Sequence, residues 1–364
     1  MLSLVSPQGS PSSAGCRTFH QSPEAANSTP AAHVNPMPIR KATPAAKQNR
    51  WGILMAGGDG TRLKSLTQMI SGDDRPKQFC RVLGGHTLLE QAQLRAARSI
   101  PPEKTIIALT QIHEHYYAQN LRQSRSPRLV QPYNRGTAPP ILLSLLNIAR
   151  QDPDALVAIL PSDHYYSNEG AFTQALESAF LVAGRNPESV VLLGVKPNGP
   201  EVEFGWIEVG SATGSIADGV FTVKGFQEKP PLLVAEQLFR SGALWNTFVM
   251  VGSVKAFLAL AWAGLPVLME ALGTSLPHSL DSMDLSIPAS LYEGISPADF
   301  SRHVLSHGFG RLLALRLDGV EWHDLGQPDR VISVLRSRSD VIPPWIHRWE
   351  SMRALSPSPI LQFE

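Results

Sequence analysis

A glycine-rich run near residue 57, with one cation at its end and another shortly after it, has residue types that suit phosphate chemistry. The run consists of Gly57, Gly58, Gly60, Thr61 and Arg62. It follows the apolar segment 51–55, and Lys77 comes shortly afterwards. Glycine N–H groups can converge on phosphate oxygens without Cβ obstruction, and Arg and Lys match the charge of phosphate. We therefore predict a triphosphate site, with a glycine-rich turn bearing surface cations as the alternative. The spacing fits neither the dinucleotide fingerprint nor the P-loop.

A carboxylate stands at the end of another predicted strand. Asp163 follows the apolar segment 155–160. Ligands of open α/β sheets bind at the carboxyl ends of strands, and Mg²⁺ prefers one or two carboxylates together with phosphate oxygens. Asp163 is therefore a candidate magnesium ligand, and its alternative role is to cap the helix that follows. A hydrolase pair of Ser162 and His164 is not supported, because no acid follows at triad spacing.

These motifs, together with Pro76-Lys77-Gln78-Phe79, resemble the sugar-1-phosphate nucleotidyltransferases. The P-K-Q-F run is most similar to the mannose-1-phosphate guanylyltransferases. The resemblance covers roughly residues 51–337 and implies that GTP and mannose 1-phosphate react to GDP-mannose and pyrophosphate. It implies that Arg62 holds the β- and γ-phosphates and that Lys77 neutralises charge near the transferring group.

Asp324 lies in the run Trp322-His323-Asp324-Leu325-Gly326. It resembles the family's second metal ligand, which with Asp163 would complete a magnesium site. The alternative for Asp324 is a turn residue before Gly326.

The loop 131–139 resembles the family's E-P-x-x-R-N-T-A-P, which lies near the base and phosphates. The resemblance implies nucleotide-binding roles for Asn134 and Thr137. Two residues depart from the pattern, because Gln131 replaces Glu and Gly136 replaces Asn. The second departure puts base recognition in question. The alternative is a loop whose Thr137 caps the next helix.

Three further motifs resemble the sugar side of the family's site. They imply that Glu228 accepts sugar hydroxyls, that Lys229 meets the sugar phosphate and that Asn246 contacts the sugar. Gly205 belongs to a segment in which the family's first glycine is replaced by Glu203. Residues 247–248, Thr-Phe, replace Ser-Gly, which would narrow the sugar pocket. The alternatives are a charged strand end and a structural Asn beside Trp245.

Composition limits the class of protein. The 364 residues are 43% hydrophobic and 17% charged, which is enough apolar material for a large core. A net charge of +1 gives no sign of a nucleic-acid partner. Two cysteines and no apolar run of membrane-spanning length favour a cytoplasmic protein without a membrane anchor. A homodimer is left open.

Alternating strand and helix patterns predict an α/β fold, namely a Rossmann-like three-layer α/β/α domain with a mostly parallel mixed sheet. Strands are expected at 51–55, 104–110, 155–160, 190–195, 205–209, 220–227, 311–317 and 320–323. Helices are expected at 88–98, 112–122, 138–150, 170–184, 232–241, 254–263 and 329–336. The catalytic domain would span 50–338, between a disordered N-terminal tail at 1–49 and an extended C-terminal tail at 339–364.

Two other functions stay open on the sequence. One is a nucleotidyltransferase for another hexose 1-phosphate or another base. The other is a non-catalytic sensor of sugar nucleotides, because Gly136 and the pair 247–248 depart from the family pattern.

Overall fold

The computed structural model describes residues 49–213, 219–275, 284–338 and 342–355. The chain divides into two compact units, residues 1–41 and 42–364, and all described residues lie in the second. The N-terminal tail predicted at 1–49 therefore lies outside the described residues, apart from Asn49.

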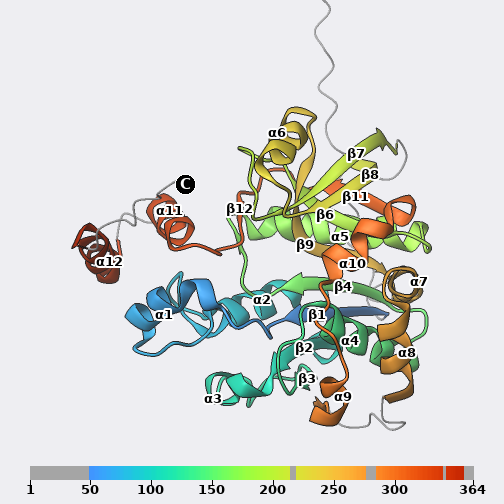
Figure 1. Ribbon diagram of the computed structural model, residues 1–364, viewed down its shortest axis with the longest axis horizontal. Coiled ribbons are helices and arrows are strands. Elements are labelled where there is room, and N and C mark those ends of the chain that lie inside the picture. The colour runs from blue at the N-terminus through green and yellow to red at the C-terminus, as the bar shows by residue number, and fades with distance from the viewer. Residues whose placement is uncertain (1–48, 214–218, 276–283, 339–341, 356–364) are drawn as a thin grey trace, which may run out of the picture. The chain divides into compact units, whose positions relative to one another are not determined.

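One ten-stranded sheet forms the centre of the described unit (Figure 1). From edge to edge its strands are β10 (Asp284–Ser286), β3 (Arg128–Gln131), β2 (Thr105–Thr110), β1 (Arg50–Met55), β4 (Leu156–Pro161), β9 (Leu244–Ser253), β6 (Val190–Val195), β11 (Leu312–Arg316), β8 (Val220–Glu228) and β7 (Gly205–Ala212). Strands β1 to β4 pair in parallel, whereas β9 runs antiparallel between β4 and β6. The sheet is therefore mixed, and β7, the last strand in this order, also pairs with β9.

The register of the parallel strands positions the site. Met55 at the end of β1 pairs with Pro161 at the end of β4, and Thr110 of β2 pairs with Gln131 of β3. The segments that follow these strands therefore leave the sheet at the same edge, which brings the glycine-rich turn level with Asp163. A small second sheet pairs β5 (Tyr165–Tyr166) with β12 (Trp322–His323) and carries the segment of Asp324 to this edge.

Helices cover both faces of the sheet because its buried strands are apolar on both sides. The helices are α1 (Lys64–Ser71), α2 (Leu88–Ala96), α3 (Glu114–Tyr117), α4 (Ala138–Gln151), α5 (Glu169–Arg185), α6 (Leu232–Arg240), α7 (Val254–Gly264), α8 (Pro266–Ser275), α9 (Ala289–Glu293), α10 (Phe300–His303), α11 (Pro328–Arg338) and α12 (Pro344–Leu355). In β1, Ile53 packs in the core with α4, α7 and α8, while its neighbour Leu54 packs in the core with α2, α5 and α6. The α/β fold with helices on both faces is thus as predicted.

Several elements differ from the sequence-based expectation. Strands β3, β5, β9 and β10 were not predicted, although β9 lies in the middle of the large sheet. Its run contains Asn246 and Thr247, polar residues that interrupt the apolar pattern of a buried strand. The helix expected at 112–122 is shorter: a 3-10 turn at Gln111–His113 precedes α3. Helix α2, expected at 88–98, opens with a capping box formed by Thr87 and Glu90.

The prediction of an extended tail at 339–364 is wrong for residues 344–355, which form α12. In this helix, Ile346 is fully buried and Trp345 is 8% exposed. They join a third core with Leu66 of α1 and Leu335 of α11, on the side of the molecule where Figure 1 shows α1, α11 and α12. The isolated sequence has no clean amphipathic period there, so only the tertiary contacts reveal the helix. Residues 339–341 and 356–364 lie outside the described part.

We predict that Ile346→Ala lowers the free energy of unfolding by about 2–5 kcal/mol, because it leaves a cavity in a packed core. Met352→Ala, on the exposed side of the same helix, is the control and should change stability by no more than about 0.5 kcal/mol. Urea unfolding measures both variants. Equal stabilities for the two would show that α12 does not dock on α1 in solution.

Candidate active site

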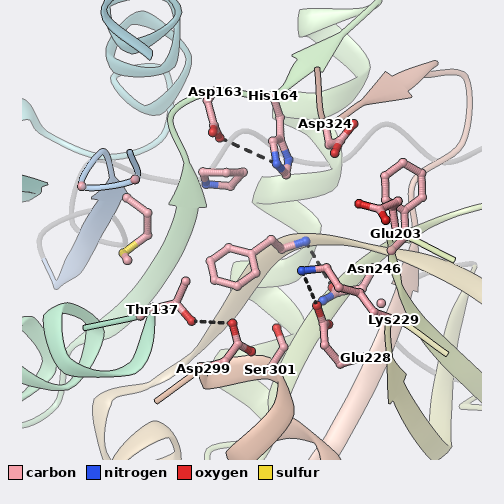
Figure 2. A pocket seen from close by; sticks show the side chains of 18 of the residues that line it. Thr137, Asp163, His164, Glu203, Glu228, Lys229, Asn246, Asp299, Ser301 and Asp324 are labelled. Carbon is pink, nitrogen blue, oxygen red and sulfur yellow. Dashed lines mark hydrogen bonds and ion pairs between the residues drawn. The ribbon is translucent and has the colours of Figure 1, made fainter. Parts of the chain in front are cut away.

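A cavity of about 330 Å³ lies at the edge of the sheet where the strand ends meet. It gathers most of the residues that the sequence singles out, as Figure 2 shows for those labelled. The predicted site residues that line it are Gly57, Gly58, Arg62, Asn134, Thr137, Asp163, Gly205, Glu228, Lys229, Asn246 and Asp324. Three others, Gly60, Thr61 and Lys77, are not among the lining residues. Segments far apart in the sequence thus form one site.

The glycine-rich turn is held against the segment that contains Lys77. Gly60 has a φ of +61°, and a Cβ there would lie 3.0 Å from the Cα of Pro76. A side chain at this position would be strained in conformation and crowded by backbone, so glycine is required. The side-chain Nε2 of Gln78 donates to the backbone oxygens of Ala56 at 3.0 Å and Gly58 at 2.7 Å. The two segments therefore form one rigid wall.

Arg62 projects from this wall into the cavity. Its guanidinium forms an ion pair with Glu203, and the two side chains are 50% and 37% exposed. Glu203 is the residue that replaces a family glycine, so no sequence pattern predicted this contact. The Arg62 guanidinium is therefore already paired with a carboxylate at the cavity.

Lys77 does not line the cavity but lies behind its lining residues, where its side chain contacts both candidate metal ligands. Its Nζ donates to the backbone oxygens of Asp324 and Leu325 and lies 3.3 Å from Oδ2 of Asp163. The side chain is only 11% exposed. The ammonium therefore joins the segment after β4 to the segment after β12, and it holds the two aspartates of the site in one place.

The two aspartates differ in their surroundings. Asp163 is 28% exposed at its side chain, whereas Asp324 accepts hydrogen bonds at Oδ1 from Arg330 Nη1 at 2.7 Å and from the backbone N of Gly326 at 3.0 Å. Burial alone would raise the pKa of Asp324, but Lys77 and Arg330 more than offset it, and the net pKa is lower than usual. Asp324 therefore carries a charge at neutral pH despite its burial.

His164 and Ser162 do not form a hydrolase pair. The Ser162 hydroxyl donates to the backbone oxygen of Met55 at 2.6 Å, and Trp322 Nε1 donates to His164 Nδ1 at 3.2 Å. Burial lowers the pKa of His164 below its usual value, although Asp163 opposes this shift. His164 is thus a neutral side chain held beside Asp163, where Figure 2 shows it.

The loop after β3 closes another side of the cavity. Gly136 has a φ of +87°, and a Cβ there would lie 2.3 Å from the backbone oxygen of Ala298. The absence of a side chain at position 136 is therefore a packing requirement in this chain. Asn134 takes part in the loop instead: its Nδ2 donates to Asp59 at 3.0 Å, and its Oδ1 accepts from the backbone N of Gly136 at 2.8 Å. The loop is thereby tied to the glycine-rich turn.

Gln131, which replaces the family's Glu, is buried and is hydrogen-bonded at both ends of its side-chain amide. The Tyr292 hydroxyl donates to its Oε1 at 3.0 Å, and its Nε2 donates to Thr110 Oγ1 at 3.0 Å. The Thr110 hydroxyl then donates to the backbone oxygen of Gly57 at 2.9 Å. This chain of hydrogen bonds fixes the orientation of the Gln131 amide and ties Thr110 to the glycine-rich turn.

The sugar-side candidates lie together at the end of β8, in β9 and, for Gly205, at the start of β7. Glu228 Oε1 is 3.7 Å from Lys229 Nζ, and Asn246 is 6% exposed. A Cβ on Gly205 would lie 2.8 Å from Glu228 Oε2, so glycine at 205 leaves room for this carboxylate. Burial, and then the nearby Asp299 carboxylate, raise the pKa of Glu228 to about 7.

This raised pKa predicts a stability that depends on pH. Folded Glu228 binds its proton more tightly than the unfolded residue, whose pKa is 4.5. Its contribution to stability is therefore fully present below pH 4.5 and is lost as the pH rises through 7, by up to roughly 3 kcal/mol. Glu228→Gln should remove this loss, so wild type should lose stability relative to the variant between pH 5 and pH 8. Urea unfolding at both pH values tests this, and parallel pH profiles would contradict it.

Two lining residues had no sequence signal. Asp299 and Ser301 lie at the start of α10, and both face the cavity (Figure 2). The Thr137 hydroxyl donates to Asp299 Oδ2 at 3.2 Å and accepts from the backbone N of Phe300 at 2.8 Å. Thr137 thus contacts α10 and makes no side-chain cap for α4, the alternative that the sequence left open. No strand directly precedes Asp299. The rule that ligands bind at the carboxyl ends of strands, which located Asp163, therefore does not point to Asp299.

A glycine-rich turn, an exposed arginine and two aspartates at one edge of a mixed α/β sheet are features of enzymes that act on nucleotides. Residues 51–339 match the nucleotidyl transferase family, and the chain belongs to that family. The predicted family is thereby confirmed.

Individual relatives match over most of this chain. The xanthan biosynthesis protein XanB of Xanthomonas campestris is 29% identical over 286 residues, which cover 78% of this chain and 58% of XanB. A mannose-1-phosphate guanylyltransferase of Klebsiella pneumoniae is 26% identical over 308 residues, covering 82% and 64%. A Thermus thermophilus structure described as a mannose-1-phosphate geranyltransferase has a TM-score of 0.68 and 29% identity, covering 80% of each chain. The chain thus spans about three fifths of the curated relatives' length.

Proposed function

We propose that this protein transfers a nucleotidyl group from GTP to mannose 1-phosphate and releases GDP-mannose and pyrophosphate. The observation that carries the proposal is the single cavity that unites the glycine-rich turn and Arg62 with the two aspartates and with Glu228 and Asn246. Phosphate-binding groups, candidate metal ligands and groups that can bind sugar hydroxyls thus face one space. The names of the Klebsiella and Thermus relatives both include mannose 1-phosphate, which supports the choice of sugar.

In this reaction a phosphate oxygen of mannose 1-phosphate attacks the α-phosphorus of GTP. The new P–O bond forms as the bond between the α-phosphorus and the oxygen that bridges the α- and β-phosphates breaks. The electron pair of the broken bond leaves with pyrophosphate. Negative charge grows on the α-phosphate and on the leaving group, so preorganised cations and accurate positioning lower the barrier. Arg62 is the exposed cation for the leaving phosphates, once they displace Glu203. Lys77 acts from below by positioning the aspartates.

Magnesium is the cofactor we propose. Within the ranges that the structure describes, no group of three or more His, Cys, Asp or Glu side chains is arranged to hold a metal. Two carboxylates facing one cavity still suit Mg²⁺, which takes its other ligands from phosphates and water. Asp163 and Asp324 would hold it, and bound Mg²⁺ would neutralise phosphate charge.

Among the described residues, no helix has the length and apolar character needed to cross a bilayer.

Pyrophosphate release measured across four nucleoside triphosphates and several hexose 1-phosphates, with Mg²⁺ present, tests the proposal. We expect the highest kcat/KM for GTP with mannose 1-phosphate. A clear preference for another pair would keep the reaction but overturn the substrates. Binding of a sugar nucleotide without turnover would favour the sensor that the sequence left open.

A further inference from the structure

Backbone strain gathers at the cavity. Among the described residues, three that are not glycine have positive φ: Lys229 at 50°, Phe248 at 62° and Leu325 at 49°. Lys229 and Phe248 line the cavity, and Leu325 adjoins the lining residue Asp324. A bulky residue in the left-handed region is a true outlier and costs free energy, and such residues collect at functional sites. Phe248 is the bulkiest of the three.

The local structure forces this conformation on position 248. The ladder between β6 and β9 shifts its register after Leu193, opposite residues 246–249. The Thr247 hydroxyl donates to the backbone oxygen of Leu193 at 2.7 Å, and the backbone N of Phe248 donates to Asn246 Oδ1 at 3.2 Å. Glycine could adopt the same backbone conformation without strain. The family pattern that residues 244–248 resemble has glycine at the position of Phe248. Phenylalanine at 248 therefore carries a conformational cost that glycine would not.

The ring supplies an apolar surface at a polar end of the cavity. Phe248 is partly buried against the core that contains Ile53 and helices α4, α7 and α8. It lines the cavity together with Glu228, Lys229 and Asn246. Hexoses present hydroxyls at their edges and C–H groups on a face of the ring. Acceptors and donors for hydroxyls beside an aromatic face match both kinds of surface.

We propose that Phe248 is a specificity-determining residue, whose ring packs against the C–H face of the hexose and limits the size of the substituents that the sugar can carry. The inference rests on the proposed function for its class of ligand, a hexose 1-phosphate. It assigns to position 248 both affinity for plain hexoses and exclusion of bulkier N-acetylhexosamines.

Phe248→Gly tests this inference, with Phe221→Gly as the matched control. Phe221 is also a partly buried phenylalanine packed on the same core, but it does not line the cavity. Isothermal titration calorimetry with mannose 1-phosphate and with N-acetylglucosamine 1-phosphate measures both affinities. We expect Phe248→Gly to weaken mannose 1-phosphate binding by about three- to tenfold, the value of an aromatic contact. It should strengthen N-acetylglucosamine 1-phosphate binding, and Phe221→Gly should leave the ratio unchanged.

Thermal unfolding separates this role from a structural one. Glycine relieves the strain at 248, so Phe248→Gly should keep Tm within about 3 °C of wild type, whereas Phe221→Gly should lower it more. Phe248→Asn is the second variant, because asparagine also tolerates positive φ. It should shift the ratio of the affinities for mannose 1-phosphate and N-acetylglucosamine 1-phosphate in the same direction. An affinity ratio that stays at the wild-type value in both Phe248 variants would overturn the inference.

The binding measurements also keep this inference separate from the proposed function. Wild type that binds mannose 1-phosphate without turnover would overturn the proposed reaction, and the Phe248 variants would still be judged by their affinities. Wild-type turnover with an unchanged affinity ratio in the variants would overturn the role of Phe248 alone. Wild type that binds neither sugar phosphate would overturn both.

Discussion

Replacing Asp163 with asparagine is expected to lower kcat by about 10²–10³-fold, comparable to the loss of one preorganised group that stabilises developing charge. Asparagine keeps the shape of the side chain, and Asp163 does not cap the following helix, because the N-cap of α5 is Asn168. The turn after β4 should therefore persist. What it removes is the charge that faces the cavity and Lys77 Nζ at 3.3 Å. The variant should therefore also need more Mg²⁺ for half-maximal turnover.

Magnesium titrations of turnover check this expectation. Asp154→Asn is the matched control, because Asp154 pairs with Lys255 on the surface, away from the cavity, with side chains 81% and 68% exposed. It should leave both kcat and the Mg²⁺ dependence unchanged. If Asp163→Asn behaves like this control, Asp163 is a structural residue and the two-carboxylate site is wrong.

Asp324→Asn separates the second carboxylate from the first. It should lose activity to a similar extent, but it should also cost about 1–3 kcal/mol of stability, because a buried partner of Arg330 is lost. Asp163→Asn should cost less, since its side chain is more exposed. The double variant should be only slightly less active than the worse single variant, because both residues belong to one site.

Lys77→Ala is expected to lower kcat by about 10²–10³-fold, although Lys77 does not line the cavity. Its ammonium joins Asp163 to the backbone of Asp324 and Leu325, so its loss should let the two segments move apart. Since the lysine acts through other residues, KM for the nucleotide should change less than kcat. The optimum Mg²⁺ concentration should shift as well.

Steady-state kinetics at several Mg²⁺ concentrations test the role of Lys77. Lys64→Ala is the control, because Lys64 is a nearby but exposed lysine that pairs with Asp74 on the surface. It should retain the activity of wild type. Turnover of Lys77→Ala within a few-fold of that control would show that the ion pair below the cavity is not needed.

Some of the site could be predicted from single segments. The glycine-rich turn and Asp163 each follow an apolar strand, and ligands of open α/β sheets bind at the carboxyl ends of strands, so both were candidates for the site. The register of these strands, with Met55 opposite Pro161, places both at the same edge of the sheet. Helices α4 and α5 begin and end within one residue of the bounds expected for them.

Other features depend on contacts between distant segments, and no local pattern encodes them. The pairing of Arg62 with Glu203 and the closure of Ala298 over Gly136 are examples. The burial of Ile346 joins the end of the chain to α1 in the same way. The sequence by itself determined the family and the residue types of the candidate phosphate site through short motifs. It determined the α/β fold through the alternation of strand and helix patterns along the chain. Only the tertiary structure decided that Lys77 lies beneath the cavity, that Asp299 enters it and that Phe248 is held at positive φ, because packing of non-local segments overrides local preference there.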